Sequence, residues 1–263
     1  MNRAGLGRWL VRFALPPVVL LAIVIAAWDA ATVALSIEKY LLPRPGQVFL
    51  AAWGDRGKLL SAALVTGEAA ACGFSLSFVG GLVVACVFSQ SRVIQRSVYP
   101  YAIFLQTVPI IAVAPLIVVW FGYGFQSVVV VAFIISLFPI ITNASTGLTA
   151  IDRNLLEWFE LAGASRWQLL WKLRLPGSVP HLVVGAKISA GLAVVGAIVG
   201  EIFAGAAMHH DGLGNLINQT NNNARMDSMF AAVLTSTCLG IVIFGTVSLV
   251  GAWVLARWQG SVG

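Results

Sequence analysis

Residues 97–151 form the longest uncharged stretch of the chain, with 55 consecutive residues that include no Asp, Glu, Lys or Arg. A helix needs about 20 apolar residues to cross the hydrocarbon core of a bilayer, so this stretch is too long for one span. The turn signal Phe121-Gly122-Tyr123-Gly124 at its centre divides it into two.

The composition of the whole chain agrees with membrane insertion. Of 263 residues, 59% are hydrophobic and only 10% are charged. Soluble domains are about 45–50% apolar and about 25% charged. So much apolar surface must face lipid rather than water, which argues against a soluble enzyme, a nucleic-acid-binding protein or a disordered chain.

Six apolar segments predict an all-α, polytopic membrane protein with six transmembrane helices. Outside the uncharged stretch they cover roughly residues 16–35, 61–88, 182–206 and 229–256. No Ser/Gly-rich or Pro-rich linker interrupts them, so we expect a single transmembrane domain over residues 1–263. The first segment follows basic residues, as a signal peptide does, but the sequence favours an uncleaved span.

The distribution of Lys and Arg predicts that both the N-terminus and the C-terminus are cytoplasmic. With this orientation ten basic residues fall in cytoplasmic segments and five in outer segments. Residues 36–60 then form an outer segment, and residues 152–180 form a cytoplasmic loop. The net charge of +6 is thus a topology signal, and we expect no nucleic-acid partner.

The cytoplasmic loop (residues 152–180) is the most charged part of the protein and predicts two short helices. Asp152 or Asn154 can cap the first helix, and Gly163 interrupts it. The second helix is expected over residues 164–173.

Pro176 and Pro180 are expected to stop the second helix. The start of that helix combines small, cationic and aromatic side chains, which suits docking in a groove of another protein. This ridge consists of Ala164, Ser165, Arg166 and Trp167.

The cytoplasmic loop resembles a motif of ABC-importer permease subunits, which contains Glu-Ala-Ala, a Gly six residues after the Glu, and a later Ile-x-Leu-Pro. The residues in register with it are Glu157, Gly163, Leu173, Leu175 and Pro176. The chain departs from the motif where Trp158-Phe159 replaces Ala-Ala and Leu173 replaces Ile.

The resemblance extends over most of the chain. The further matching segments are Leu42-Pro43-Arg44-Pro45, Gln106-Thr107-Val108-Pro109, Ala114-Pro115-Leu116, Trp120-Phe121-Gly122-Tyr123-Gly124, Gly163-Ala164-Ser165-Arg166 and Gly212-Leu213-Gly214. Together they are similar to the branch of the family that serves nitrate, sulfonates, taurine, thiamine precursors and related vitamins.

This resemblance implies a permease of the type I ABC importer kind in the bacterial cytoplasmic (inner) membrane. Two copies would form a homodimeric channel, two ATP-binding subunits would bind ATP and Mg, and an extracytoplasmic solute-binding protein would deliver the solute. The residues implied to couple the permease to the ATPase are Glu157, Gly163, Ala164, Ser165, Arg166 and Trp167.

The chain itself is expected to be non-catalytic and to hold no cofactor or metal. It contains no GxxxxGK[ST] phosphate-binding loop, because its one Gly-Lys pair, Gly57-Lys58, is followed by Leu59. His209-His210-Asp211 is a poor metal site, since adjacent histidines do not share a helix face. No set of residues typical of an intramembrane protease is present.

Polar residues inside the spans are candidates for the translocation pathway, because they are costly in lipid. Each could instead bond a neighbouring helix, and a proline allows a bend that lines a cavity. The candidates are Glu68, Gln106, Pro109, Asn143 and Glu201.

Two questions stay open at this stage. An ATP-independent carrier is a more distant alternative, and it would need Glu68 and Glu201 as an ion-coupling pair. The substrate is also open, although Glu68 would disfavour an anion. A neutral or cationic heterocycle such as a thiamine precursor is therefore expected before nitrate, a sulfonate or taurine.

Overall fold

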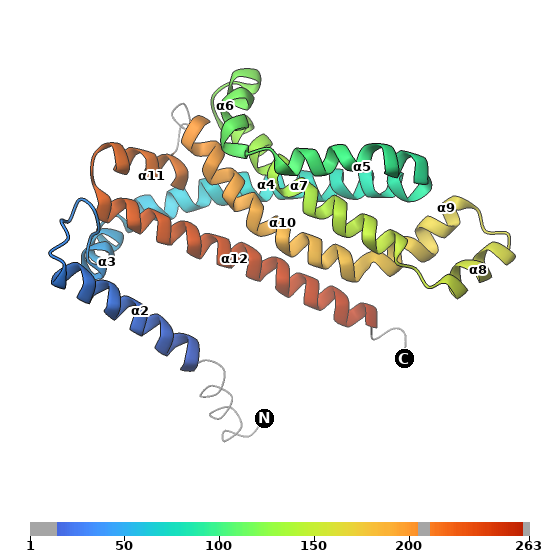
Figure 1. The fold of residues 1–263 in the computed structure, drawn as a ribbon, viewed down its shortest axis with the longest axis horizontal. Helices are drawn as coiled ribbons and strands as arrows, with labels where there is room; N and C mark the ends of the chain where they lie inside the picture. The colour runs from blue at the N-terminus through green and yellow to red at the C-terminus, as the bar shows by residue number, and fades with distance from the viewer. Residues whose placement is uncertain (1–14, 205–210, 260–263) are drawn as a thin grey trace. The chain divides into compact units, whose positions relative to one another are not determined.

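The computed structural model describes residues 15–204 and 211–259, which are almost entirely helical and contain no strand (Figure 1). The chain divides into two compact units. Among the described residues, unit 1 contains those up to Gly57 together with Ile217–Val233, and unit 2 contains those of the range Lys58–Leu216 together with those from Leu234 onward. An all-α fold is therefore confirmed, whereas the single domain over residues 1–263 stays a prediction.

In chain order the helices are α2 (Leu15–Ala34), α3 (Pro45–Gly54), α4 (Arg56–Gln90), α5 (Arg92–Thr107), α6 (Ile110–Phe121), α7 (Phe125–Thr149), α8 (Arg153–Leu161), α9 (Arg166–Leu169), the π-helical turn η2 (Leu170–Arg174), α10 (Leu175–Ala204), α11 (Leu213–Asn222) and α12 (Met226–Gln259). Five helical segments in the described part are long and apolar enough to cross a membrane. They are α2, α4, α7, the continuous segment Arg166–Ala204, and α12, and they confirm five of the six predicted spans.

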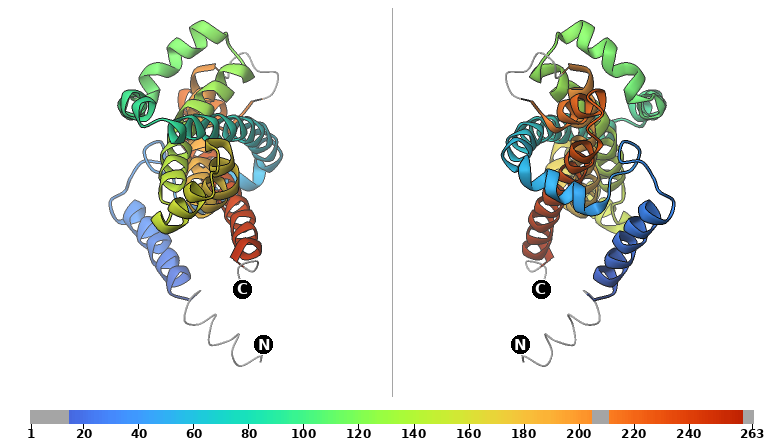
Figure 2. Two further views of the ribbon diagram at one scale, coloured as in Figure 1. Left: turned by 90° about the vertical axis from the view of Figure 1, so that its right-hand side faces the viewer. Right: turned by 90° about the vertical axis from the view of Figure 1, so that its left-hand side faces the viewer.

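The predicted third span is two helices rather than one, because the chain breaks at Val108 and Pro109. α6 has only 12 residues and is too short to cross alone. Pro109 disfavours helical dihedrals at the residue before it, and Val108 is extended with φ −71° and ψ 123°. Figures 1 and 2 show α6 turning away from the direction of α5.

The turn predicted between the third and fourth spans is present. Gly122 and Gly124 have φ of +85° and +122°, which are values that other residues rarely adopt. α7 begins directly after them at Phe125.

The prediction that Pro176 and Pro180 end the second loop helix is wrong. α9, η2 and α10 form one uninterrupted helical segment of 39 residues, Arg166–Ala204. In the π-turn the Leu175 N–H donates to the Leu170 carbonyl, five residues back. This wider turn precedes Pro176, so the hydrogen bond that a proline cannot donate is lost next to a turn that already departs from the α-helical pattern.

α7 and α10 form the centre of unit 2 and pack closely through small residues. A Cβ built at Gly196 would lie 2.7 Å from the Ala132 Cα, and one at Gly200 would lie 2.9 Å from the Val128 Cα. The Ser189 hydroxyl donates to the Ser136 carbonyl at 2.6 Å across the same contact. The small face that the sequence shows at residues 196–200 is thus used for close helix approach, as in many membrane proteins.

α4 packs against α7 in the same way. A Cβ at Gly73 would lie 2.5 Å from the Ala132 Cβ, and one at Gly81 would lie 2.7 Å from the Ile140 Cγ2. Ala69 and Ala70 of α4 join the same buried cluster as residues of α7 and α10. Three helices therefore share one core of Gly, Ala, Ser and Val.

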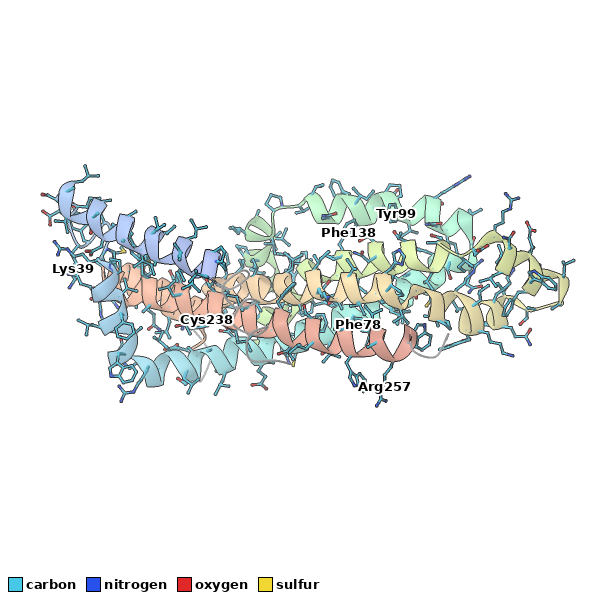
Figure 3. The ribbon with its side chains drawn as sticks, turned by 90° about the horizontal axis from the view of Figure 1, so that it is seen from below. Lys39, Phe78, Tyr99, Phe138, Cys238 and Arg257 are labelled. Carbon is cyan, nitrogen blue, oxygen red and sulfur yellow. The ribbon has the colours of Figure 1, made fainter. Side chains whose placement is uncertain are left out.

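The end of α12 shows how a charged residue is held at the border of an apolar helix. The Arg257 guanidinium, labelled in Figure 3, lies 4.4 Å from the centroid of the Trp253 ring. Such a cation–π contact one helical turn apart lets the side chain cover apolar surface while the charge stays near water.

Replacing Gly196 by Val should separate α7 from α10, because the added atoms have no space between the two helices. Overpacking of this kind costs about 1–3 kcal/mol. We expect a lower apparent melting temperature of the detergent-solubilised protein, measured by fluorescence-detected size exclusion after heating.

Gly191→Val is the matched control, because nothing lies within 4 Å of a Cβ at that position of the same helix. Equal melting temperatures for the two variants would contradict the assigned packing.

Candidate functional site

The first helix of the predicted cytoplasmic loop, residues 152–180, ends in a glycine-dependent turn. α8 is capped by the Asp152 side chain, which accepts from the Asn154 N–H at 2.8 Å. At its other end, Gly163 has φ +71° and donates to the Glu160 carbonyl, while the Ala164 N–H donates to the Phe159 carbonyl. This pair of bonds is a Schellman motif, and it confirms that Gly163 interrupts the helix.

The second half of the cytoplasmic loop begins with a capping box. The Ser165 hydroxyl accepts from the Gln168 N–H at 3.3 Å, and the Ser165 N–H donates to the Gln168 Oε1 at 2.8 Å. Leu170 then packs with Ala85, Ala144 and Leu148, so the loop is fixed to α4 and α7.

The cytoplasmic loop carries large apolar side chains that are exposed in the single chain. The exposed residues are Leu155, Trp158, Leu161, Trp167 and Trp171. Among the predicted coupling residues, Ser165, Arg166 and Trp167 are exposed and Ala164 is half-buried. Glu157 is exposed and pairs with Arg153 at 3.3 Å, a surface contact of little energetic weight.

A polar pocket of about 250 Å³ lies between the cytoplasmic loop and the end of α4. Its lining residues are Ser89, Gln90, Glu160, Arg166, Leu169 and Arg174. The Arg174 guanidinium donates to the Ser89 carbonyl, one of the last carbonyls of α4. This bond gives an otherwise unpaired helix-end carbonyl a charged donor and ties the loop to that helix.

The structure does not gather the five predicted pathway residues into one site. Glu68, Gln106 and Pro109 are exposed on the surface of the single chain. Asn143 is half-buried, and its amide donates to the Pro139 carbonyl of its own helix at 2.8 Å. Its Cβ would be 2.9 Å from a Cβ at Gly185, so it sits where α7 meets α10.

Glu201 is different from the other four, because it is completely buried. Its Oε2 accepts from the Thr66 hydroxyl at 3.0 Å and from the Gly214 N–H at 2.7 Å. The Leu213 N–H donates in turn to the Thr66 hydroxyl oxygen at 2.9 Å. Sequence reasoning singled out Glu201 and the Gly212-Leu213-Gly214 segment but did not connect them, and it missed Thr66.

The two carboxylates that a carrier would need as an ion-coupling pair do not meet in this chain. Glu68 follows Thr66 by two residues, which places it about 200° round the helix from the side that bonds Glu201. Glu68 is exposed, whereas Glu201 has no exposed surface. This arrangement removes the residue pair on which the carrier alternative depended.

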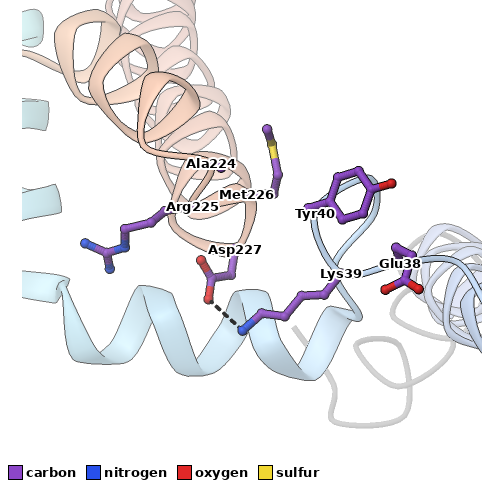
Figure 4. A pocket seen from close by; sticks show the side chains of 7 residues that line it. All are labelled: Glu38, Lys39, Tyr40, Ala224, Arg225, Met226 and Asp227. Carbon is purple, nitrogen blue, oxygen red and sulfur yellow. Dashed lines mark ion pairs between the residues drawn. The ribbon is translucent and has the colours of Figure 1, made fainter.

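A second polar site, in unit 1, brings residues 38–40 of the predicted outer segment next to the start of α12 (Figure 4). The pocket has a volume of about 460 Å³ and is lined by Glu38, Lys39, Tyr40, Ala224, Arg225, Met226 and Asp227. Lys39 and Asp227 pair at 3.6 Å. Arg225 points away from that pair and contacts Asp55 at 3.3 Å.

Sequence analysis missed this outer site, because its charges come from two segments almost 190 residues apart. The charged residues around positions 38–55 and 225–227 are visible in the sequence, but their pairing depends on the tertiary fold. Both ion pairs are partly exposed, so they orient the segments more than they stabilise them.

The sequence predicts no metal site at His209-His210-Asp211, and the structure describes only the last of these three residues. His209 and His210 lie outside the described residues, while Asp211 accepts from the Asn215 side-chain amide at 2.5 Å. Within residues 15–204 and 211–259, no three His, Cys, Asp or Glu side chains are grouped so that they could hold a metal ion.

Comparison with known proteins places these features in a family. Residues 77–256 match the family described as "Binding-protein-dependent transport system inner membrane component". The chain is 32% identical over 259 residues to the riboflavin transport system permease protein RibX of Chloroflexus aurantiacus, covering 97% of this chain and 95% of the relative.

A second relative and a solved structure agree with that match. The formylaminopyrimidine transport permease protein ThiX of Halalkalibacterium halodurans is 32% identical over 235 residues, covering 89% of this chain and 92% of ThiX. A chain of the MetNI methionine ABC transporter in an inward-facing conformation has a similar fold, with a TM-score of 0.64 and 19% identity, covering 78% of this chain and 98% of that chain.

Replacing Gly163 by Val should weaken the turn between α8 and α9. A β-branched residue at φ +71° costs about 1–2 kcal/mol or more, although a Cβ would meet no neighbour there. In this variant we expect the amides of residues 163 and 164 to exchange with deuterium roughly 5–30 times faster than in the unaltered protein.

Gly163→Asn is the matched control, because Asn adopts the left-handed conformation more readily than other residues with a side chain. Its exchange should stay near that of the unaltered protein. If Val and Asn gave the same protection, the backbone conformation would not be the reason for glycine at this position.

Proposed function

Because the chain belongs to the family of inner-membrane components of binding-protein-dependent transport systems, we propose that it is the permease subunit of an ATP-driven importer for a small organic solute. The chain is a multi-pass protein of the bacterial cytoplasmic membrane. The observation that carries the proposal is the cytoplasmic loop, which is folded into capped helices, packed onto the spans by Leu170, and exposes large apolar side chains.

The cytoplasmic loop is the part that we assign to ATPase coupling. Its exposed Trp167 and Arg166 can enter a groove of an ATP-binding subunit, with the aromatic ring supplying contact area and the guanidinium supplying polar bonds. Glu157 and Gly163 act through the shape of the loop, since one pairs with Arg153 and the other forms the turn.

Two copies of the chain, two ATP-binding subunits and an extracytoplasmic binding protein make up the proposed complex. The ATP-binding subunits supply the site for ATP and Mg, because this chain has no phosphate-binding loop. Both termini of the permease are then cytoplasmic, which brings residues 152–180 to the side where ATP is found.

The proposed substrate is a small vitamin-like heterocycle such as a thiamine precursor. Two relatives of similar identity are named for riboflavin and for formylaminopyrimidine, both of which contain nitrogen heterocycles. Glu68 lies exposed in the second predicted span, where a carboxylate suits a neutral or cationic solute better than an anion. Import of nitrate, a sulfonate or taurine by the same mechanism is the alternative.

The function can be tested with the permease co-expressed with the ATP-binding subunit encoded beside it and purified into lipid nanodiscs. ATP hydrolysis is measured with the neighbouring binding protein while pyrimidine precursors, riboflavin, nitrate, taurine and alkanesulfonates are added in turn. Stimulation by a pyrimidine or riboflavin supports the proposal, and stimulation only by an anion replaces the proposed substrate class. A purified permease that retains no ATPase contradicts the importer assignment.

Truncating Trp167 to Ala should weaken retention of the ATP-binding subunit, because the variant loses a large exposed ring from the docking ridge. Loss of an interface aromatic of this kind costs about 2 kcal/mol or more, which is roughly a 30-fold loss of affinity. The measurement is the ATPase-to-permease ratio after tandem purification.

Trp120→Ala is the control, since Trp120 is similarly exposed but lies at the end of α6, away from the cytoplasmic loop. It should leave the ratio unchanged. Equal retention in both variants would remove Trp167 from the docking ridge.

A further inference from the structure

The residue just before α11 has no side chain with which to cap the helix. The residue before the helix is Gly212, whose carbonyl accepts the first helical bond from Leu216 but which has no side chain. The first N–H groups of a helix need acceptors, particularly when they are buried. Leu213 and Gly214 are both buried, so their N–H groups require partners from elsewhere in the fold.

Thr66 and Glu201 supply those acceptors from two other helices. The Leu213 N–H donates to the Thr66 oxygen, the Thr66 hydroxyl donates to Glu201 Oε2, and the Gly214 N–H donates to the same carboxylate oxygen. One continuous hydrogen-bonded chain therefore joins α4, α10 and the start of α11. All of its members belong to unit 2.

The carboxylate also fits the glycines around it. A Cβ at Gly212 would lie 2.2 Å from Glu201 Oε1, and one at Gly214 would lie 2.3 Å from the Ile198 carbonyl oxygen. Only residues without a side chain allow the backbone to approach α10 this closely.

The carboxyl group of Glu201 faces a helix N-terminus rather than a cation. None of the ion pairs in the described part of the chain includes Glu201. The positive end of the α11 dipole and two hydrogen bonds take that role. A buried carboxylate in a predicted span thus has a local partner that explains its position.

α10 connects this anchor directly to the cytoplasmic loop. Arg166 and Glu201 belong to the same uninterrupted helical segment of 39 residues, which is about 58 Å long at 1.5 Å per residue. The exposed ridge residues Arg166 and Trp167 stand at one end of this segment, and Glu201 stands near the other.

We propose that Glu201 and Thr66 are positioning residues that make α11 follow the movement of α10 during transport. The inference rests on the proposed function, because it takes the cytoplasmic loop as the part that an ATPase moves. When the loop end of α10 shifts, the carboxylate carries the start of α11 with it. Glu201 thereby forms a joint, that is, a hydrogen-bonded connection between α10 and α11, and it does not contact the solute.

The test uses the complex of permease and ATP-binding subunit in nanodiscs, with no transported ligand required. Cys72, Cys86 and Cys238 are replaced by Ser, and Asn221→Cys places one reporter thiol on the exposed end of α11. The rate of maleimide labelling is measured without nucleotide and with ATP plus vanadate. We expect the nucleotide to change this rate at least about threefold when Thr66 and Glu201 are intact.

Thr66→Val keeps the shape of the side chain but removes the hydroxyl that links Leu213 to Glu201. It should reduce the nucleotide-dependent change in labelling, because only the Gly214–Glu201 bond then connects α11 to α10, while ATPase retention and ATP hydrolysis persist. Thr66→Ser restores the hydroxyl and should rescue the response. Thr142→Val is the control for the loss of a threonine hydroxyl as such, because the partly buried Thr142 hydroxyl bonds only to carbonyls of its own helix.

The outcomes distinguish a failure of the joint from a failure of the proposed function. A complex without ATPase contradicts the proposed function itself. A hydrolysing complex in which Thr66→Val responds to nucleotide as fully as the Thr142→Val control overturns the joint and leaves the importer assignment intact. Glu201→Gln gives a second reading: it keeps an acceptor for Gly214, so it should respond more strongly than Glu201→Ala, and equal responses would also overturn the joint.

Discussion

Close contact between α7 and α10 is the interaction on which the rest of unit 2 depends. Lipid tails are as apolar as leucine side chains, so helices in a membrane gain little from apolar burial and rely on packing and on hydrogen bonds between them. Gly196 and Gly200 allow the two backbones to approach, and the Ser189–Ser136 bond fixes their register. With α10 held in this way, the cytoplasmic loop at one end and Glu201 at the other end have defined positions.

The transmembrane character of the chain was predictable, because apolar length and charge position are local properties of a sequence. The same applies to the glycine turns at Gly122 and Gly163, where backbone conformation depends on the residue itself. The end of the second loop helix was not predictable by that reasoning. A proline rule describes a regular α-helix, whereas the π-turn before Pro176 changes the hydrogen-bond pattern that the rule assumes.

The partners of the polar residues were also beyond sequence reasoning. Thr66 is 135 residues from Glu201 and 147 from Leu213, and nothing in the local sequence connects them. Glu68, the charged residue nearby, was predicted to line the translocation pathway because a carboxylate in a span is unusual. The less conspicuous threonine two residues earlier makes the buried contacts. The same limit explains why the outer site with Lys39 and Asp227 was missed.

The contact between Glu201 and Gly212 has a consequence for which sequences this fold can accept. The carboxylate fills the volume that a side chain at residue 212 would occupy, since the two would be only 2.2 Å apart. The two positions therefore share one space and cannot vary independently. A chain of this fold that carries a side chain at residue 212 must have a shorter residue at 201, and the Gly214 N–H then needs another acceptor, which a polar side chain at residue 212 can supply.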